Sequence, residues 1–336
     1  MTPSYRLLQI YGEKLPDFLQ EAAASPLMQR LRGVGMNCGC EYTSFPRFAG
    51  LGSYSRFDHS LGTALIVWRF THDKAQALAG LLHDAATPAF AHVIDFLRGD
   101  YLTQEATEAG TEEAIRSDAA LQVLLRSLHL RTEDVSDYHR YPIADNDSPR
   151  LSADRLEYSL GNMVNFGIRS MDAVRRIYDD LTVVRNEDGT EELAFLHPET
   201  AADFSSAALE CAKIYVCDDD RYAMQMLAEL IRSAVADGIV AEKDLYGTEA
   251  QFLEKLCLSP DYARRWADFR ALARTERSDC DRGGAWRQIF AKKRCINPLI
   301  AGLGRTSAVD PAFRAALAAF RASPQEYRVC GYPEAY

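Results

Sequence analysis

Hydrophobic residues recur at helical spacing along most of the chain. After His59, one helical face collects the apolar side chains of Leu61, Ala64, Leu65 and Trp68. The stretch 74–84 repeats this pattern, and Pro88 then disfavours helical geometry at the residue before it. The spacing therefore predicts two helices. The pair His83-Asp84 is expected near the C-terminus of the second helix, where a chain can open onto a cleft.

The same periodicity predicts further helices, and one segment departs from it. The expected helices cover 111–128, 150–162, 171–180, 199–216, 221–236, 248–257, 260–275 and Pro311 to Ala322, the last with proline at an allowed first-turn position. Between them, 181–187 and 190–196 are strand-like, and Asp188-Gly189 suits the two-residue type I′ turn of a β-hairpin.

These elements predict a mainly α fold: a helical bundle with a small β-hairpin and a helical C-terminal extension. No repeat, low-complexity tract or linker divides the chain. We expect an N-terminal segment over 1–24 and a helical core over 25–180. The hairpin and the C-terminal helices, over 181–336, are expected to pack on that core.

Composition narrows the classes of function. Of the 336 residues, 47% are hydrophobic and 26% are charged, as in ordinary globular proteins, so a sizeable core is expected. The formal net charge of −10 repels polyanions at long range, which argues against nucleic-acid partners. A small phosphorylated ligand stays compatible with this charge, because a local metal ion can outweigh it.

The cysteines and the N-terminal residues favour a cytoplasmic protein. The eight cysteines form no CxxC pair and are expected to be reduced thiols. The first residues lack a basic start followed by an apolar run, and no apolar stretch reaches the ~20 residues that span a bilayer. We therefore expect no membrane partner.

Four segments carry residues with the chemistry of a metal site. They contain His59, the pair His83-Asp84, His92 with Asp95, and Asp154. Two imidazoles and two carboxylates make a mixed nitrogen and oxygen site that suits a divalent transition metal. Adjacent residues on a helix are about 100° apart, so a neighbouring histidine and aspartate can both lean towards one ion. The other ligands must then come from other helices of the bundle.

The order of these segments resembles the HD-domain phosphohydrolases, most closely their dNTP triphosphohydrolase-like branch. The resemblance covers about 25–240 and rests on SPLMQRLRGVG (25–35), the Phe-Pro ending of 42–46, SRFDHSLGTA (55–64), LLHDAATPAFAHVID (81–95) and DRLEY (154–158). It implies that the helical core is an HD domain. It also implies one divalent transition metal, Fe, Mn, Zn, Ni or Co, held by His59, His83, Asp84 and Asp154.

The resemblance implies roles for residues around the metal. Arg56 and Arg155 stand where the family places cations against substrate phosphates, with lysine more usual at the second position. His92 and Asp95 match a pocket histidine and the acid that supports catalysis, so His92, Asp95 and Arg56 are the expected catalytic residues. The expected substrate-binding residues are Arg56, Arg155, Tyr158, Asn162 and Tyr222.

Several positions depart from the branch. Thr87 and Gln104 stand where it carries histidines, and neither side chain titrates near neutrality. Asn162 replaces an acid that commonly reads the sugar hydroxyl. The run Asp218–Asp220 stands where the family offers basic residues, and such a run opposes a polyphosphate. These departures argue against triphosphate hydrolysis.

Two charged stretches receive simpler interpretations. The polar run 144–149, with Asp145 and Asp147, is expected to form a loop near the pocket. The basic run Lys292–Arg294 is expected to be a solvated turn rather than an anion site.

The sequence thus predicts a metal-dependent phosphohydrolase that acts on a nucleotide or another small phosphate ester by metal-activated water. The alternative is a catalytically degenerate HD domain that binds metal and nucleotide as a sensor, which Thr87 and Gln104 motivate. A two-iron oxidative centre would need more histidines near the first site than His92 alone. Related proteins form oligomers, and the apolar 311–322 helix suits either a homo-oligomer interface or packing on its own core.

Overall fold

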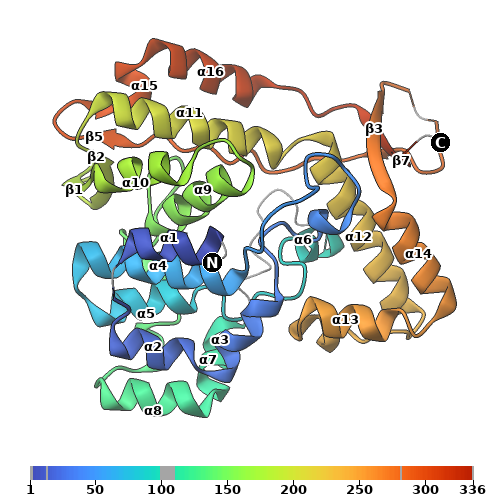
Figure 1. Ribbon diagram of the computed structural model, residues 1–336, viewed down its shortest axis with the longest axis horizontal. Helices are drawn as coiled ribbons and strands as arrows, with labels where there is room; N and C mark the ends of the chain where they lie inside the picture. Colours follow the sequence, from blue (N-terminus) through green and yellow to red (C-terminus); the bar gives the residue numbers. More distant parts are fainter. Residues whose placement is uncertain (1–2, 13, 99–109, 281, 335–336) are drawn as a thin grey trace.

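A computed structural model describes residues 3–12, 14–98, 110–280 and 282–334. The fold is mainly α, as predicted (Figure 1). Three helices position the candidate site: α4 (Arg56–Thr71), α5 (Lys74–Leu82) and α9 (Ala153–Asn165). Helix α4 packs against both α5 and α9, so side chains from three separate parts of the sequence meet along it.

Further helices surround these three. They are α1 (Pro3–Tyr11), α2 (Asp17–Ala23), α3 (Pro26–Arg30), α6 (Val93–Arg98), α7 (Thr111–Ser117), α8 (Ala119–Ser127), α10 (Met171–Asp179), α11 (Pro198–Ile214), α12 (Asp218–Ala236), α13 (Glu249–Leu256), α14 (Pro260–Arg270), α15 (Thr306–Val309) and α16 (Pro311–Ala322). The helix predicted over 111–128 is divided at Asp118. The carboxylate of Asp118 accepts hydrogen bonds from the N–H groups of Ala120 and Leu121, at 3.0 Å each, and so begins a new helix.

The predicted β-hairpin is confirmed, although its turn is longer than expected. Strands β1 (Leu181–Arg185) and β2 (Glu191–Phe195) pair antiparallel, and β5 (Leu299–Ile300) and β6 (Gly304–Arg305) extend the sheet in the order β1-β2-β5-β6. The N–H of Asn186 donates to the carbonyl of Thr190 at 2.8 Å, which closes a three-residue loop rather than a two-residue turn. Gly189 provides the positive φ of 76° that this loop requires.

A second sheet corrects the prediction for 260–275. Strand β3 (Leu272–Ser278) pairs antiparallel with β7 (Arg328–Pro333), which also pairs with β4 (Arg287–Gln288). The predicted helix is therefore too long, since α14 ends at Arg270 and the chain becomes a strand at Leu272. The partner strand lies near the C-terminus of the chain, so local sequence does not reveal this pairing.

Two large hydrophobic clusters form the interior. One joins α1, α2, α4, α5 and α8 to α11, and the other joins α6, α12, α13 and α14 with β3 and β7. The segment 40–48 belongs to the second cluster through Cys40, Phe45 and Phe48. The candidate site draws residues from elements of both clusters. The boundaries expected at 24 and 180 stay a prediction.

Helix α16 uses its apolar face within the chain. Phe313, Leu317 and Phe320 pack against Leu209 and Ala212 of α11, and the two helices run side by side in Figure 1. The structure thus accounts for this helix by packing on its own core. Among the described helices, none is both long and apolar enough to cross a bilayer.

Candidate metal centre

The start of α4 places His59 one turn into the helix. Ser55 is the N-cap: its Oγ accepts the Asp58 N–H at 3.2 Å, while the Asp58 carboxylate accepts the Ser55 N–H at 3.0 Å. This capping box begins the helix at Arg56. His59 then projects from the first turn and is 1% exposed.

The end of α5 places His83. The helix ends at Leu82, and His83 is its C-cap residue, as the position of Pro88 predicts. The Nδ1–H group of His83 donates to the carbonyl of Gly80 at 2.8 Å. This hydrogen bond leaves the lone pair of Nε2 directed away from α5, towards His59.

Helix α9 contributes two carboxylates on one face. Ser152 caps it, and Asp154 and Glu157 follow three residues apart, so both reach α4. Gly62 lets the two helices approach, because a Cβ atom there would lie 2.7 Å from Glu157 Cγ and Oε1. The buried Glu157 carboxylate accepts hydrogen bonds from His59 Nδ1 at 2.6 Å and from the Tyr54 hydroxyl at 2.5 Å.

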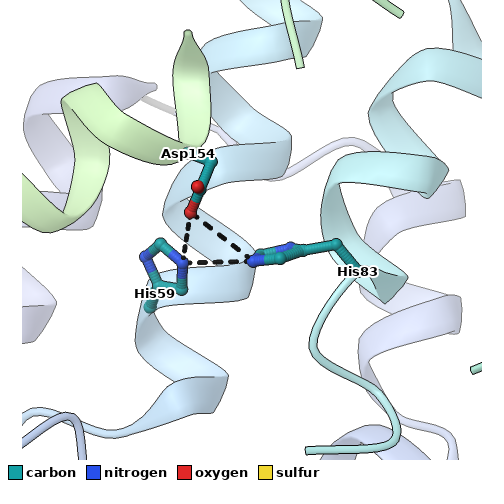
Figure 2. Close-up of side chains that lie close together, drawn as sticks. All are labelled: His59, His83 and Asp154. Atoms are coloured by element: carbon teal, nitrogen blue, oxygen red, sulfur yellow. Dashed lines mark hydrogen bonds and ion pairs between the residues drawn. The ribbon is translucent and has the colours of Figure 1, made fainter. Parts of the chain in front are cut away.

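His59, His83 and Asp154 converge from these three helices (Figure 2). The Nε2 atom of His59 lies 3.0 Å from Asp154 Oδ1 and 3.2 Å from His83 Nε2, and the third distance, from His83 Nε2 to Asp154 Oδ1, is 3.7 Å. Ligand atoms bound to one transition metal at about 2.0–2.2 Å stand roughly 3 to 3.5 Å apart. The three donor atoms are therefore spaced as ligands of a single ion.

The surroundings of these residues also fit a cation. Both histidines bond through Nδ1 to an acceptor behind them, the arrangement by which proteins orient metal-ligating imidazoles. Burial lowers the pKa of His59, but hydrogen bonds with Asp154 and Glu157 outweigh burial and raise it to about 10. Positive charge is thus strongly favoured between these carboxylates, and a metal ion bound to neutral imidazoles would supply it.

Asp84 lies beside this group. Its Oδ2 atom is 3.5 Å from His83 Nε2 and 3.9 Å from His59 Nε2, and it accepts a 2.9 Å hydrogen bond from Arg56 Nη1. Its Oδ1 atom accepts the hydroxyl proton of Thr87 at 2.7 Å. Burial would raise the pKa of Asp84, but Arg56 and the two histidines hold it well below its ordinary value. Asp84 is therefore an anion next to the cluster, oriented by Arg56 and Thr87.

The cluster opens onto a cavity of about 560 Å³, within the size range of small-molecule sites. The cavity is lined by nine of the residues that the sequence singles out: Arg56, His59, His83, Asp84, His92, Asp154, Arg155, Tyr158 and Asn162. Asp145 and Asp147 line it as well, so the predicted loop near the pocket is confirmed.

Both arginines that are predicted to bind phosphate line this cavity. Arg56 is 7% exposed, and its Nε atom is buried without a hydrogen-bond partner in the described part of the chain. Arg155 Nη1 lies 2.9 Å from the Asp145 carboxylate and 2.9 Å from Asn146 Oδ1. These contacts orient both guanidinium groups near the metal cluster.

His92 and Asp95 form a dyad at the start of α6, and His92 lines the cavity. Asp95 Oδ2 accepts the Nδ1–H group of His92 at 2.9 Å, and Asp95 itself is fully buried. Burial lowers the pKa of His92, and Arg294 and Arg56 lower it further against the opposing hydrogen bond with Asp95. The lowered pKa favours the neutral imidazole, whose Nε2 lone pair lies on the side of Arg294, with Arg294 Nη2 3.5 Å away.

Aromatic side chains form another part of the cavity. Tyr158 and Tyr215 have ring centroids 6.3 Å apart, and Asn162 donates a 2.8 Å hydrogen bond to the Tyr215 hydroxyl. Asn162 Oδ1 is buried and makes no hydrogen bond within the described residues. This region offers flat apolar surfaces and one polar acceptor to an organic group.

Other predicted residues lie elsewhere. Tyr222 is 1% exposed, its hydroxyl donates to the carbonyl of Ala285 at 3.2 Å, and it is absent from the described lining of the cavity. The Asp218–Asp220 run begins α12, and of the three only Asp220 reaches the cavity lining described here. Gln104 lies outside the described residues.

Four residues used in the description of the site have no functional role predicted from the sequence: Glu157, Tyr215, Lys292 and Arg294. Glu157 lies inside the DRLEY segment, but its contact with His59 depends on the approach of α9 to α4. Lys292 and Arg294 both line the cavity; Arg294 is half-buried, whereas Lys292 is exposed, as expected for a solvated segment. Their basic character is visible in the sequence, whereas the folding of the segment over the cavity is not.

Comparisons with known proteins find two relatives in sequence, one of which is named a phosphohydrolase. No protein-family model matches the chain. The chain is 24% identical over 249 residues to the uncharacterized protein YdhJ of Bacillus subtilis, covering 74% of this chain and 73% of that protein. It is 26% identical over 214 residues to the metal-dependent phosphohydrolase cns2 of Cordyceps militaris, covering 63% of this chain and 58% of that protein.

Solved structures share the fold over nearly the whole length. A phosphohydrolase from Bacteroides thetaiotaomicron superposes with a TM-score of 0.67 at 14% identity, covering 96% of this chain and 97% of that one. A hypothetical protein from Aquifex aeolicus gives a TM-score of 0.60 at 16% identity, covering 94% and 93%. These comparisons support an HD-like phosphohydrolase superfamily and do not distinguish the triphosphohydrolase branch within it.

Proposed function

We propose that the protein is a metal-dependent phosphohydrolase acting on a nucleotide or another small phosphate ester. The convergence of His59, His83 and Asp154 beside a cavity with two buried or half-buried arginines carries the proposal. The name of the Cordyceps relative and that of the Bacteroides structure agree with this class of reaction. His59, His83 and Asp154 would hold the ion, with Asp84 as the fourth ligand.

A divalent ion bound there supplies Lewis acidity towards a phosphoryl oxygen and lowers the pKa of a water molecule. Side chains of the protein would bind the substrate phosphate and transfer the proton. Arg56 and Arg155 bind the phosphate and stabilise the charge that develops on it. Arg56 is oriented for this by Asp84, and Arg155 by Asp145.

His92 is the proposed general base. Its Nδ1–H group is held by Asp95, so Nε2 is the atom that would accept a proton from water, beside the Arg294 guanidinium group 3.5 Å away. Because its pKa is lowered, the imidazole is in the base form at neutral pH. Asp95 acts by orienting the ring.

Tyr158, Asn162 and Tyr215 would bind the organic part of the substrate. Two aromatic rings and an amide suit a flat group with hydrogen-bonding edges, such as a nucleoside. Thr87 donates its hydroxyl hydrogen bond to Asp84, and a threonine hydroxyl is too weak an acid to protonate a leaving group, which argues against triphosphate hydrolysis.

The test is phosphate release from a panel of nucleoside mono-, di- and triphosphates and simple phosphate monoesters, with the protein loaded with Mn²⁺, Fe²⁺, Co²⁺, Ni²⁺ or Zn²⁺. The proposal expects turnover of at least one compound that Asp154→Asn abolishes and that Asp179→Asn, an exposed aspartate on α10, leaves intact. Bound metal without release from any compound would contradict the hydrolase and favour the sensor alternative.

A further inference from the structure

Tyr54 lies two residues before the start of α4, and the backbone on both sides of it is held in place. The N–H of Met36 donates to the carbonyl of Tyr54 at 3.1 Å, and the N–H of Arg56 donates to the carbonyl of Val34 at 2.8 Å. These two bonds tie the segment before α4 to the chain at 34–36. The side chain of Tyr54 is 7% exposed, so its hydroxyl needs a hydrogen-bond partner inside the protein.

That partner is the carboxylate of Glu157 on α9. The Tyr54 hydroxyl donates to Glu157 Oε2 at 2.5 Å, and His59 Nδ1 lies 2.6 Å from the same oxygen atom. One buried oxygen therefore holds both groups. A carboxylate in the protein interior requires such donors, because an unpaired buried charge is strongly destabilising. The hydroxyl thus fixes the oxygen atom on which the orientation of His59 depends.

Two glycines make room for this arrangement. Gly62 follows His59 by one helical turn on α4, and Gly161 follows Glu157 by one turn on α9, so each lies on the same helix face as the residue before it. A Cβ atom at Gly62 would lie 2.7 Å from Glu157 Oε1, and a Cβ atom at Gly161 would overlap the Tyr54 hydroxyl. The hydroxyl and the carboxylate therefore occupy space that both helices leave free of side chains.

The chain of contacts continues from His59 to the metal cluster (Figure 2). His59 Nε2 lies 3.0 Å from Asp154 Oδ1 and 3.2 Å from His83 Nε2. When Nε2 of a neutral imidazole binds an ion, the proton is on Nδ1, where the Glu157 carboxylate accepts it. A shift of this carboxylate would turn the imidazole ring and move Nε2 relative to the other two donor atoms.

We propose that Tyr54 is a positioning residue of the metal centre. Its hydroxyl holds the Glu157 oxygen that orients His59, and so sets the affinity of the site for a divalent ion and the geometry of its ligands. Tyr54 is absent from the described lining of the cavity, so it acts through Glu157 rather than on the substrate. The proposal rests on the metal centre of the proposed function and does not depend on the reaction that follows.

The alternative is a purely structural role, in which the hydrogen bond stabilises the packing of α4 on α9 and leaves the ion unaffected. Such a role predicts a loss of stability with unchanged metal affinity. Tyr178 on α10 provides the matched control, because it is fully buried and its hydroxyl donates to the carbonyl of Tyr11 at 3.2 Å. Tyr178→Phe therefore removes a buried tyrosine hydrogen bond and leaves the bond between Tyr54 and Glu157 in place.

The test is calorimetric titration of Zn²⁺ into Tyr54→Phe, Glu157→Gln and the double variant, with circular dichroism spectra confirming that each is folded. Tyr54→Phe should weaken Zn²⁺ binding about tenfold, the lower end of the range for groups that support a ligating histidine. It should also shift the visible absorption of bound Co²⁺, which reports the ligand geometry. Added to Glu157→Gln, Tyr54→Phe should weaken binding by less than about twofold, because its effect passes through the carboxylate. Tyr178→Phe should keep the wild-type Zn²⁺ affinity and Co²⁺ spectrum, whatever its melting temperature.

Wild-type Zn²⁺ affinity, tighter binding or an unchanged Co²⁺ spectrum in Tyr54→Phe would overturn the positioning role. An equal loss of affinity in Tyr178→Phe, or a full additional loss in the double variant, would overturn it as well. Phosphate release is a separate measurement. Weakened Zn²⁺ binding in Tyr54→Phe without release by the wild type would keep the positioning role and remove the hydrolase. Release by the wild type with unchanged Zn²⁺ affinity in Tyr54→Phe would do the reverse.

Discussion

His59 and Glu157 are joined by a 2.6 Å hydrogen bond between Nδ1 and Oε2, although they lie 98 positions apart in the sequence. The bond crosses from α4 to α9 and fixes the imidazole so that Nε2 faces His83 and Asp154. Both side chains are 1% exposed. The carboxylate behind His59 is therefore part of what makes the cluster a cation site.

Replacing Glu157 by glutamine should weaken metal binding about 10- to 100-fold, the usual cost of losing a carboxylate behind a ligating histidine. The amide keeps the size of the side chain but removes the charge that orients His59. Calorimetric titration with Mn²⁺ or Zn²⁺ measures the change. Glu210→Gln, on the exposed side of α11, is the matched control and should bind as the wild type does. Unchanged metal affinity in Glu157→Gln would show that Glu157 does not contribute to metal binding.

Gly62→Ala should both destabilise the fold and disturb the site. A Cβ atom at this position would lie 2.7 Å from Glu157 Oε1, so either the helices separate or Glu157 moves. We expect a loss of roughly 1–3 kcal/mol in the free energy of unfolding, as for other overpacked interiors, together with weaker metal binding. At Gly12, the nearest atom would be 3.5 Å away, so Gly12→Ala should change metal binding little. Denaturant unfolding and metal titration of both variants make the comparison.

A residue of this site can be predicted from the sequence when its role depends on a short segment. It cannot be predicted when its role depends on contacts between segments far apart in the chain. His59, His83 and Asp154 stand in short segments whose order resembles a known superfamily, and the structure brings them together. The role of Glu157 is hidden, because it requires the close approach that Gly62 permits. The position of Arg294 in the cavity cannot be predicted either. It depends on hydrogen bonds that hold its segment to distant residues, from Ala291 to Gln325 and from Ser148 to Cys295.

The same reasoning explains the errors in the fold. Helices with a clear apolar face, such as 311–322, are predicted closely because the signal is local. The split at Asp118 depends on a capping side chain inside a continuous helical pattern. Strand β3 depends on a partner at 328–333, so the pattern of 272–275 alone favours continuing α14.

His92→Gln should lower kcat by about 10²–10⁴-fold while leaving metal affinity nearly unchanged, because the residue moves a proton and binds no metal. In the wild type, activity should rise with pH as His92 loses its proton. Since the pKa of His92 is lowered, that rise should lie below the ordinary value of 6.5. The pH profile of kcat/KM checks this, and an unaltered acid limb in His92→Gln would assign proton transfer to another group.

Glu41 should make the protein less stable at alkaline pH. Burial, reinforced by the nearby Glu249, raises the pKa of Glu41 to about 8 from an ordinary 4.5. The folded state then binds more protons than the unfolded state between these values, so stability is full below about 4.5 and is lost as pH rises through about 8. One such proton contributes at most about 1.4 kcal/mol per pH unit.

Glu41→Gln should flatten this dependence and raise the melting temperature at pH 8 relative to the wild type. Glu254→Gln, an exposed glutamate on α13, is the control and should retain the wild-type slope. Thermal unfolding from pH 5 to pH 9 measures both. A wild-type slope in Glu41→Gln would show that another group carries the pH dependence.

The most direct test of the central claim is the metal content of the purified protein and of three single variants: His59→Ala, His83→Ala and Asp154→Asn. The proteins are stripped of metal with a chelator and then reconstituted with it. Equal melting temperatures or circular dichroism spectra confirm that the variants are folded. We expect one divalent ion per wild-type chain, with loss of that ion in each variant and retention in Asp179→Asn. Failure of the wild-type chain to bind metal, or full occupancy in the three variants, would contradict the metal centre and the function proposed from it.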